Sequence, residues 1–100
     1  FPQGLVEVEA TVKNIDESIF MPSTYQVEDA IVKSGLNVEV FEVVSYEGLY
    51  GGIFQEGEKI VVKGTLEKVE DRIKQKQYCR VVVGSLQAEG KDYIKPKFLL

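Results

Sequence analysis

The side chains with the clearest chemical potential lie in the second half of the chain. Seven cations fall within twenty-two residues there: Lys59, Lys63, Lys68, Arg72, Lys74, Lys76 and Arg80. Clustered cations neutralise the phosphates of nucleic acids, and tyrosine rings stack on unpaired bases. The sequence therefore predicts a nucleic-acid contact with charge from Arg72, Lys74 and Lys76 and rings from Tyr46, Tyr50 and Tyr78. A lysine-rich hairpin tip is also ordinary solubilising surface, and that alternative stays open.

The distribution of charge along the chain limits this prediction. Residues 1–50 hold two basic and nine acidic residues, a balance of −7, whereas residues 51–100 hold ten basic and seven acidic residues, a balance of +3. The net charge of −4 argues against tight non-specific binding to phosphate backbones. The basic half leaves room for a local contact with an anionic ligand.

Catalytic machinery is not recognisable in the sequence. Histidine is absent and Cys79 is the single cysteine, so imidazole-based catalysis, imidazole-ligated zinc and an internal disulfide are all excluded. The glycine-rich stretch 48–57 is not followed by the Gly-Lys-Ser/Thr of a phosphate loop. A metal-dependent enzyme would have to rely on carboxylates such as Glu7 and Glu9, whose alternate spacing is typical of a solvated strand face. We expect no catalytic residue, metal ligand or cofactor in this chain.

Five segments have the apolar pattern of β-strands, and turn residues separate them. The expected strands are 5–13, 25–33, 38–46, 59–69 and 77–83. In the second strand, Tyr25, Val27 and Ile31 are predicted to share one face. In the third, the apolar phase slips between Val40 and Phe41, which indicates a bulge.

The remaining segments connect or follow these strands. Gly64 is expected to be a bend point in the long fourth strand, because glycine often marks a bend inside a strand. Residues 47–58 are expected to form a tight turn or one helical turn, and residues 70–76 a charged connection. The segment from Gly84 onward is expected to pack back on the sheet through Tyr93, Ile94 and Phe98.

These elements predict the fold class. Five bent strands and no strong amphipathic helix favour an all-β, five-stranded, closed or partly open antiparallel barrel of the OB type. Residues 1–100 are expected to form a single domain, and the start at Phe1 suggests that it is excised from a longer protein. The sequence has neither a membrane-spanning apolar run nor a signal peptide, and its lone cysteine fits the cytoplasm.

Several blocks of the sequence together resemble the C-terminal region of archaeal predicted nucleotidyltransferases. They are residues 8–12, 21–29, 42–48, 57–69, 80–84 and 92–94. In that family the catalytic domain lies upstream and carries a Gly-Ser pair followed by spaced aspartates that bind a divalent metal and the nucleotide. None of that motif is present here. The resemblance therefore implies a non-catalytic accessory domain that helps to position a nucleic acid or another acceptor for the upstream domain.

A second interpretation is that the barrel is a structural or protein-interaction module. It would dock on the catalytic domain or form a homodimer without touching the substrate. An exposed apolar patch around Leu49, Tyr50, Ile53 and Phe54 would favour this interpretation. A continuous positive stripe with exposed rings would instead favour nucleic acid.

Overall fold

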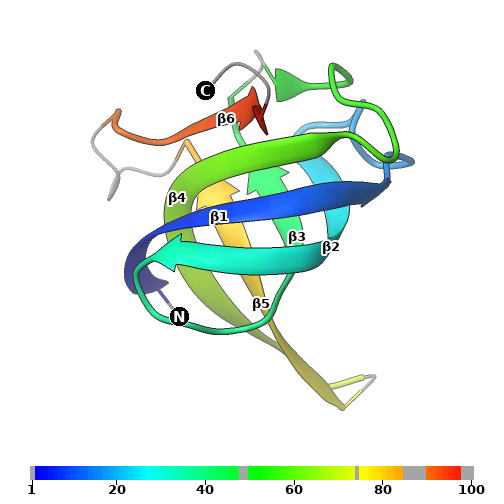
Figure 1. The fold of residues 1–100 in the computed structure, drawn as a ribbon. Coiled ribbons are helices and arrows are strands. Elements are labelled where there is room, and N and C mark those ends of the chain that lie inside the picture. Colours follow the sequence, from blue (N-terminus) through cyan, green and yellow to red (C-terminus); the bar gives the residue numbers. More distant parts are fainter. Residues whose placement is uncertain (1, 48–49, 74, 85–89, 98–100) are drawn as a thin grey trace.

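The computed structural model describes residues 2–47, 50–73, 75–84 and 90–97 (Figure 1). It contains six strands: β1 (Pro2–Asn14), β2 (Ser23–Ser34), β3 (Val40–Ser45), β4 (Lys59–Asp71), β5 (Lys76–Val83) and β6 (Tyr93–Pro96). The described residues include no α-helix, and no helix among them is long and apolar enough to cross a membrane. The all-β fold class is therefore confirmed.

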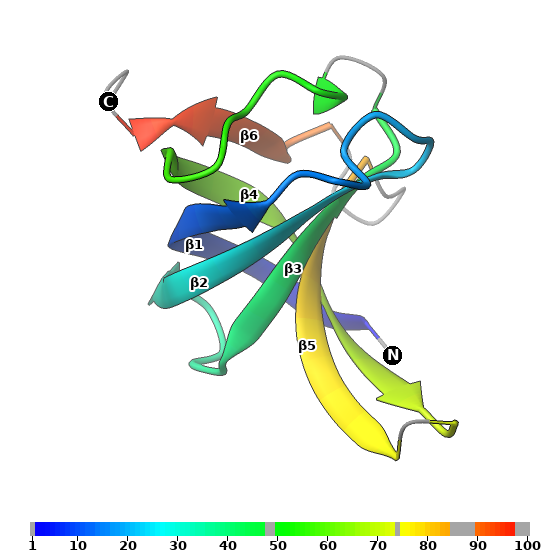
Figure 2. The same cartoon turned by 90° about the vertical axis from the view of Figure 1, so that its right-hand side faces the viewer.

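The first five strands close into a barrel (Figures 1 and 2). Their order around the ring is β1-β2-β3-β5-β4, and β4 pairs back with β1. All neighbouring pairs are antiparallel except β3 and β5, which run parallel. The prediction of a purely antiparallel barrel needs this correction, because strand directions cannot alternate everywhere around a closed ring of five. The arrangement is OB-like, with β6 added along β4.

Apolar residues at alternate positions fill the interior of the barrel. In β1, the inward side chains are Val6, Val8, Ala10 and Val12, and all are buried. The other strands contribute a matching set: Tyr25, Val27, Val40, Val43, Ile60, Val62, Leu66, Val81, Val83 and Ile94. Burial of this apolar surface is the main force that holds the strands in a closed ring.

The prediction that Tyr25, Val27 and Ile31 share one face of β2 is wrong for Ile31. Tyr25 and Val27 point into the core, but Ile31 is 59% exposed. Asp29 adopts a left-handed conformation with φ of 54°, and the pairing of β1 with β2 shifts register at this point. At this irregularity the inward and outward faces of the strand are exchanged. Ala30 and Val32 therefore pack against the core in place of Ile31.

The two predicted irregularities in β3 and β4 are present. The register between β3 and β5 shifts between Val40 and Glu42, as expected of a bulge. Gly64 lies where one edge of β4 changes partner, from β6 over Ile60–Lys63 to β5 from Thr65 onward. A Cβ atom at Gly64 would lie 2.5 Å from the Val82 carbonyl oxygen, so the strands approach closely there because position 64 carries no side chain.

A buried tyrosine fixes the glycine-rich segment between β3 and β4. The Tyr25 hydroxyl donates to the carbonyl oxygen of Tyr50 at 2.6 Å and accepts from the Ile53 amide at 3.1 Å. Phe54, which is 2% exposed, packs edge-on against the Tyr25 ring at 5.5 Å. The Tyr50 amide donates to the Glu47 carbonyl at 3.2 Å, in agreement with the predicted tight turn.

The C-terminal segment also packs as predicted, as far as it is described. Ile94 of β6 is 4% exposed and belongs to the core, and Tyr93 is half-buried. Phe98 lies outside the described residues.

Candidate ligand groove

An open groove crosses the outer face of β2 and β3 beside the start of β5. One end of it is a cavity of about 660 Å³ lined by Lys13, Gln26, Val27, Phe41, Glu42, Asp71, Lys76, Gln77 and Tyr78. The other end shares Lys13, Val27 and Phe41 and continues over Glu28, Asp29, Ala30, Asn37, Val38, Glu39 and Val40. Figure 2 shows β2, β3 and β5 side by side, between the 15–22 connection and the β4–β5 hairpin. In OB barrels this face is where ligands commonly bind.

Some of the residues that were predicted to contact nucleic acid line this groove. Lys76 and Tyr78 line it, and Arg72 is exposed at the tip of the adjoining hairpin. Lys74 lies outside the described residues. The connection is shorter than predicted, because β4 continues to Asp71 and β5 begins at Lys76.

The other two predicted rings lie elsewhere. Tyr46 follows Ser45, which pairs with Val83 at the far end of the parallel β3–β5 ladder, whereas Tyr78 lies near the opposite end, where Val40 pairs with Cys79. Tyr50 is half-buried against the core, and its carbonyl accepts the Tyr25 hydroxyl. The structure therefore does not bring Tyr46, Tyr50 and Tyr78 together as one stacking platform.

A polar network that the sequence analysis did not identify adjoins the groove at Glu42. Arg80 donates through Nε to Glu67 at 2.9 Å, and its Nη2 lies 2.8 Å from the same carboxylate oxygen. Its Nη1 lies 3.9 Å from Glu42. These three residues face one another because Glu42 pairs with Arg80 across β3 and β5, and Arg80 pairs with Glu67 across β5 and β4. Only the strand register could have identified the network.

Burial controls the ionisation of this network. Desolvation raises the pKa of the Glu42 carboxyl, although Arg80 and a hydrogen bond from the Tyr78 hydroxyl oppose the rise. Desolvation and the neighbouring Glu42 charge also raise the pKa of Tyr78. Glu42 thus places a partly desolvated carboxylate in the lining of the groove, where Arg80 and the Tyr78 hydroxyl interact with it.

The charges that line the groove are mainly negative. Two cations, Lys13 and Lys76, line its two ends, against five carboxylates: Glu28, Asp29, Glu39, Glu42 and Asp71. Phosphate groups are repelled by such an excess of carboxylates. The described part of the groove therefore lacks the continuous positive stripe that would favour nucleic acid.

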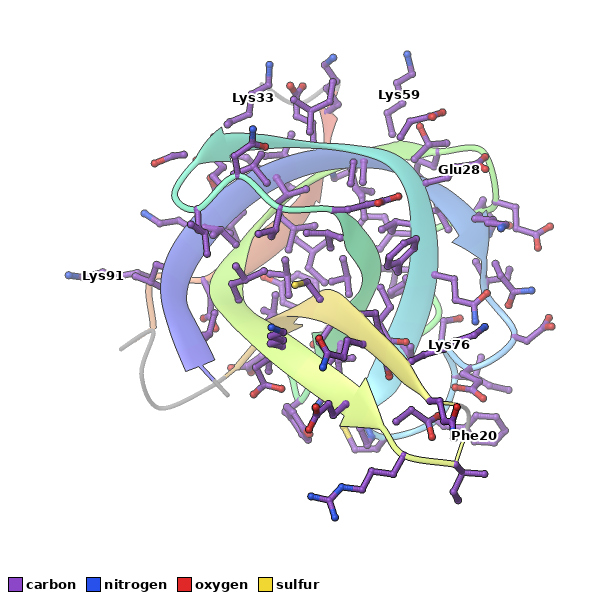
Figure 3. The ribbon with its side chains drawn as sticks, turned by 90° about the horizontal axis from the view of Figure 1, so that it is seen from below. Phe20, Glu28, Lys33, Lys59, Lys76 and Lys91 are labelled. Carbon is purple, nitrogen blue, oxygen red and sulfur yellow. The ribbon has the colours of Figure 1, made fainter. Side chains whose placement is uncertain are left out.

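Exposed apolar side chains lie on the 15–22 connection, within the groove and at the hairpin tip. On the 15–22 connection, Ile19 is 75%, Phe20 is 61% and Met21 is 62% exposed. Phe41 within the groove is 47% exposed, and Ile73 at the hairpin tip is 96% exposed. Phe20 and Lys76 project from the same side of the barrel in Figure 3. The sequence analysis did not predict Ile19, Phe20 and Met21 as exposed apolar residues, because they lie in a connection without strand periodicity.

The apolar patch that the sequence did predict is not formed as a surface. Phe54 is buried in the core and Tyr50 is half-buried, whereas Ile53 is 53% exposed and Leu49 lies outside the described residues. A Cβ atom at Gly52 would meet the Ile19 side chain at 3.5 Å, so this segment borders the 15–22 connection.

The carboxylates of β1 are engaged by other side chains. Glu9 forms ion pairs with Lys33 at 2.7 Å and Lys97 at 3.0 Å, and Glu7 accepts the Tyr93 hydroxyl at 3.2 Å. Within the described ranges, no three Asp, Glu, His or Cys side chains are grouped closely enough to hold a metal ion.

Comparison with known proteins finds an archaeal relative. An uncharacterized protein of Methanocaldococcus jannaschii, MJ1086, is 34% identical over 94 residues. The match covers 94% of this chain but 26% of that protein. This chain therefore spans about a quarter of the curated relative. No known protein family and no solved structure matches it.

Proposed function

We propose that this barrel is a non-catalytic accessory domain of a longer, nucleotidyltransferase-like protein, and that its groove docks the neighbouring domain. The resemblance to the C-terminal region of such proteins supports the first part, and the match to one quarter of an archaeal relative supports a place within a longer protein. Any divalent metal would belong to the upstream catalytic domain. A lone cysteine, Cys79, fits the cytoplasmic location that we propose.

One observation carries the docking proposal: exposed apolar side chains lie within the acidic groove and on the connection that leads into β2. Phe41 in the groove and Phe20 on the connection offer apolar anchors of the kind that dominate protein interfaces. The Glu42 network offers half-buried acceptors, which suit the amide, lysine or arginine donors of a polypeptide. The docked surface is therefore expected to be basic around an apolar centre.

The full-length protein provides the test. Hydrogen exchange followed by mass spectrometry should show residues 15–22 protected. The double substitution Phe20→Asp and Phe41→Asp should accelerate exchange in this segment by at least tenfold. The matched control is Ile31→Asp, because Ile31 is exposed to a similar extent but lies neither in the groove nor on the 15–22 connection. Free exchange of residues 15–22 in the unaltered protein would contradict the proposal, as would equal effects of the two substitutions.

The second candidate is that the groove positions a nucleic acid, as the sequence predicted. It is favoured by one observation, that Lys76, Tyr78 and Phe41 lie together in the groove. Binding of single-stranded RNA that is lost on Arg72→Ala and Lys76→Ala would support it over docking. A homodimer is the remaining alternative, and a mass of two chains by light scattering that reverts with Phe20→Asp would identify it.

A further inference from the structure

Five lysines lie on the outer faces of three strands or directly after them, and none of the five lines the groove. We name this surface the lysine face; it consists of Lys33 on β2, Lys59 and Lys63 on β4, Lys95 on β6 and Lys97 directly after β6. Figure 3 shows Lys33 and Lys59 projecting from one side of the barrel, and Lys76 and Phe20 from another.

Strand alternation places these lysines on one surface. Ile60 and Val62 of β4 and Ile94 of β6 point into the core, so their neighbours Lys59, Lys63 and Lys95 point outward. The β4 and β6 ladders set Lys63 opposite Tyr93 and Val61 opposite Lys95. Neighbouring strands lie about 4.8 Å apart, so these cations form a compact two-dimensional array.

The lysine face is positive on a protein that is negative as a whole. Its five lysines are accompanied by Glu7 and Glu9 on β1 and by Glu28 on β2, which pairs with Thr11 opposite Lys59, so its balance is 5 − 3 = +2. Because the net charge of the chain is −4, the remaining residues carry −4 − 2 = −6. A positive surface of this kind on an acidic protein steers polyanions toward it.

Two lysines of the array, Lys33 and Lys97, are held by ion pairs within the barrel. Lys59, Lys63 and Lys95 remain available to a ligand. Lys33 and Lys97 both bind Glu9, and these bonds lower the pKa of the Glu9 carboxyl from its ordinary value. The Lys95 ammonium lies 4.6 Å from the centre of the Tyr93 ring, whose hydroxyl is held by Glu7. Among the described residues, no carboxylate lies within ion-pairing distance of Lys59, Lys63 or Lys95.

We propose that the lysine face binds the phosphate backbone of a single-stranded nucleic acid. Lysines are flexible point charges without the fixed fork of arginine, so they suit sequence-independent contacts with successive phosphates. The lysine face shares no lining residue with the docking groove, so it is a separate surface. This inference stands independently of what occupies the groove.

Other polyanions fit the surface less well. Insertion into an anionic membrane needs apolar side chains beside the cations, and the lysine face offers Ile31 as its one strongly exposed apolar residue among those described. An acidic protein partner would need an apolar or aromatic interface core, and Tyr93, the ring on this surface, is held down by Glu7 and covered by Lys95.

The test compares two charge-matched triple variants of the barrel within the full-length protein. The first is Lys59→Ala, Lys63→Ala and Lys95→Ala; the control is Lys13→Ala, Arg72→Ala and Lys76→Ala. Each removes three positive charges, so both reach a net charge of −4 − 3 = −7 for this chain. Binding of a fluorescent twenty-nucleotide oligo-uridine is followed by anisotropy from 25 to 200 mM salt.

The lysine-face variant should bind at least tenfold more weakly than the unaltered protein. The slope of log affinity against log salt should fall by about 2, because each lost phosphate contact on a single strand removes about 0.7. The control should keep most of the affinity. Equal losses in both variants would overturn the proposal, since they would reflect bulk charge alone. Loss in the control only, or tighter binding of poly-glutamate or phosphatidylserine vesicles than of the oligonucleotide, would also overturn it.

Discussion

Replacement of Tyr25 by phenylalanine removes one oxygen atom from the interior and leaves the ring in place. That oxygen donates to the Tyr50 carbonyl at 2.6 Å and accepts from the amides of Ile53 at 3.1 Å and Phe54 at 3.5 Å. The edge-on packing of the ring on Phe54 needs no hydroxyl. The substitution therefore isolates the hydrogen bonds that fix the glycine-rich segment to β2.

The expected loss of stability is about 2 kcal/mol. Each of the two shorter bonds contributes about 1 kcal/mol, and the bond at 3.5 Å adds little because it is long. Tyr50 is half-buried and Ile53 is exposed, so water can reach the freed backbone groups and keep the loss near this value. For a domain of this size, the midpoint of urea unfolding should fall by roughly 1 M at unchanged slope.

Urea unfolding followed by circular dichroism measures this change. The matched control is Tyr46→Phe, because Tyr46 is 53% exposed and should change the free energy of unfolding by less than about 0.5 kcal/mol. Native-state hydrogen exchange should also accelerate at the Ile53 and Phe54 amides. Indistinguishable midpoints for the two variants would refute the assignment of Tyr25 as the anchor of this segment.

Two further substitutions test the barrel corner and the groove. Gly64→Ala should destabilise the protein by about 3 kcal/mol, because its Cβ would overlap the Val82 carbonyl. The control is Gly90→Ala, because a Cβ atom at Gly90 would meet no atom within 4 Å and should cost only the roughly 1–2 kcal/mol of a left-handed alanine. Thermal melts measure both losses, and similar values would show that β4 and β5 are not closely packed at Gly64. Glu42→Gln should stabilise the protein at pH 7, because burial raises the pKa of this carboxyl and thus penalises its ionised form. The advantage should shrink as the pH falls from 7 through the raised pKa, and a constant difference between pH 7 and pH 4 in urea unfolding would contradict this.

The strands were predictable because their apolar periodicity is strong. Alternation in β1 and the phase slip at Val40 both have physical counterparts in the barrel. The turnover of β2 at Asp29 was not predictable from periodicity, because aspartate carries no obvious signal for a left-handed residue inside a strand. The parallel pairing of β3 with β5 follows only from closure of the ring, which no local pattern contains.

The surfaces were harder to predict than the strands. The sequence showed the basic cluster but not which of its members share a face. The fold divides that cluster, with Lys76 in an acidic groove and Lys59 and Lys63 on a different surface. Lys33, Lys95 and Lys97 join the latter from segments distant in the chain, so the lysine face exists only through the pairing of β1 with β2 and β4 and of β4 with β6.

The two ladders of β1 have a consequence for biosynthesis. β1 finds its first partner, β2, nearby in the chain, but its second ladder joins Leu5 to Thr65, sixty positions later. Until β4 leaves the ribosome, the nascent β1–β2–β3 meander must carry an open edge and a half-covered apolar face, which other chains can capture. Ring closure is therefore a late, all-or-none event, and nascent chains that are released before it should be the main substrates for chaperones.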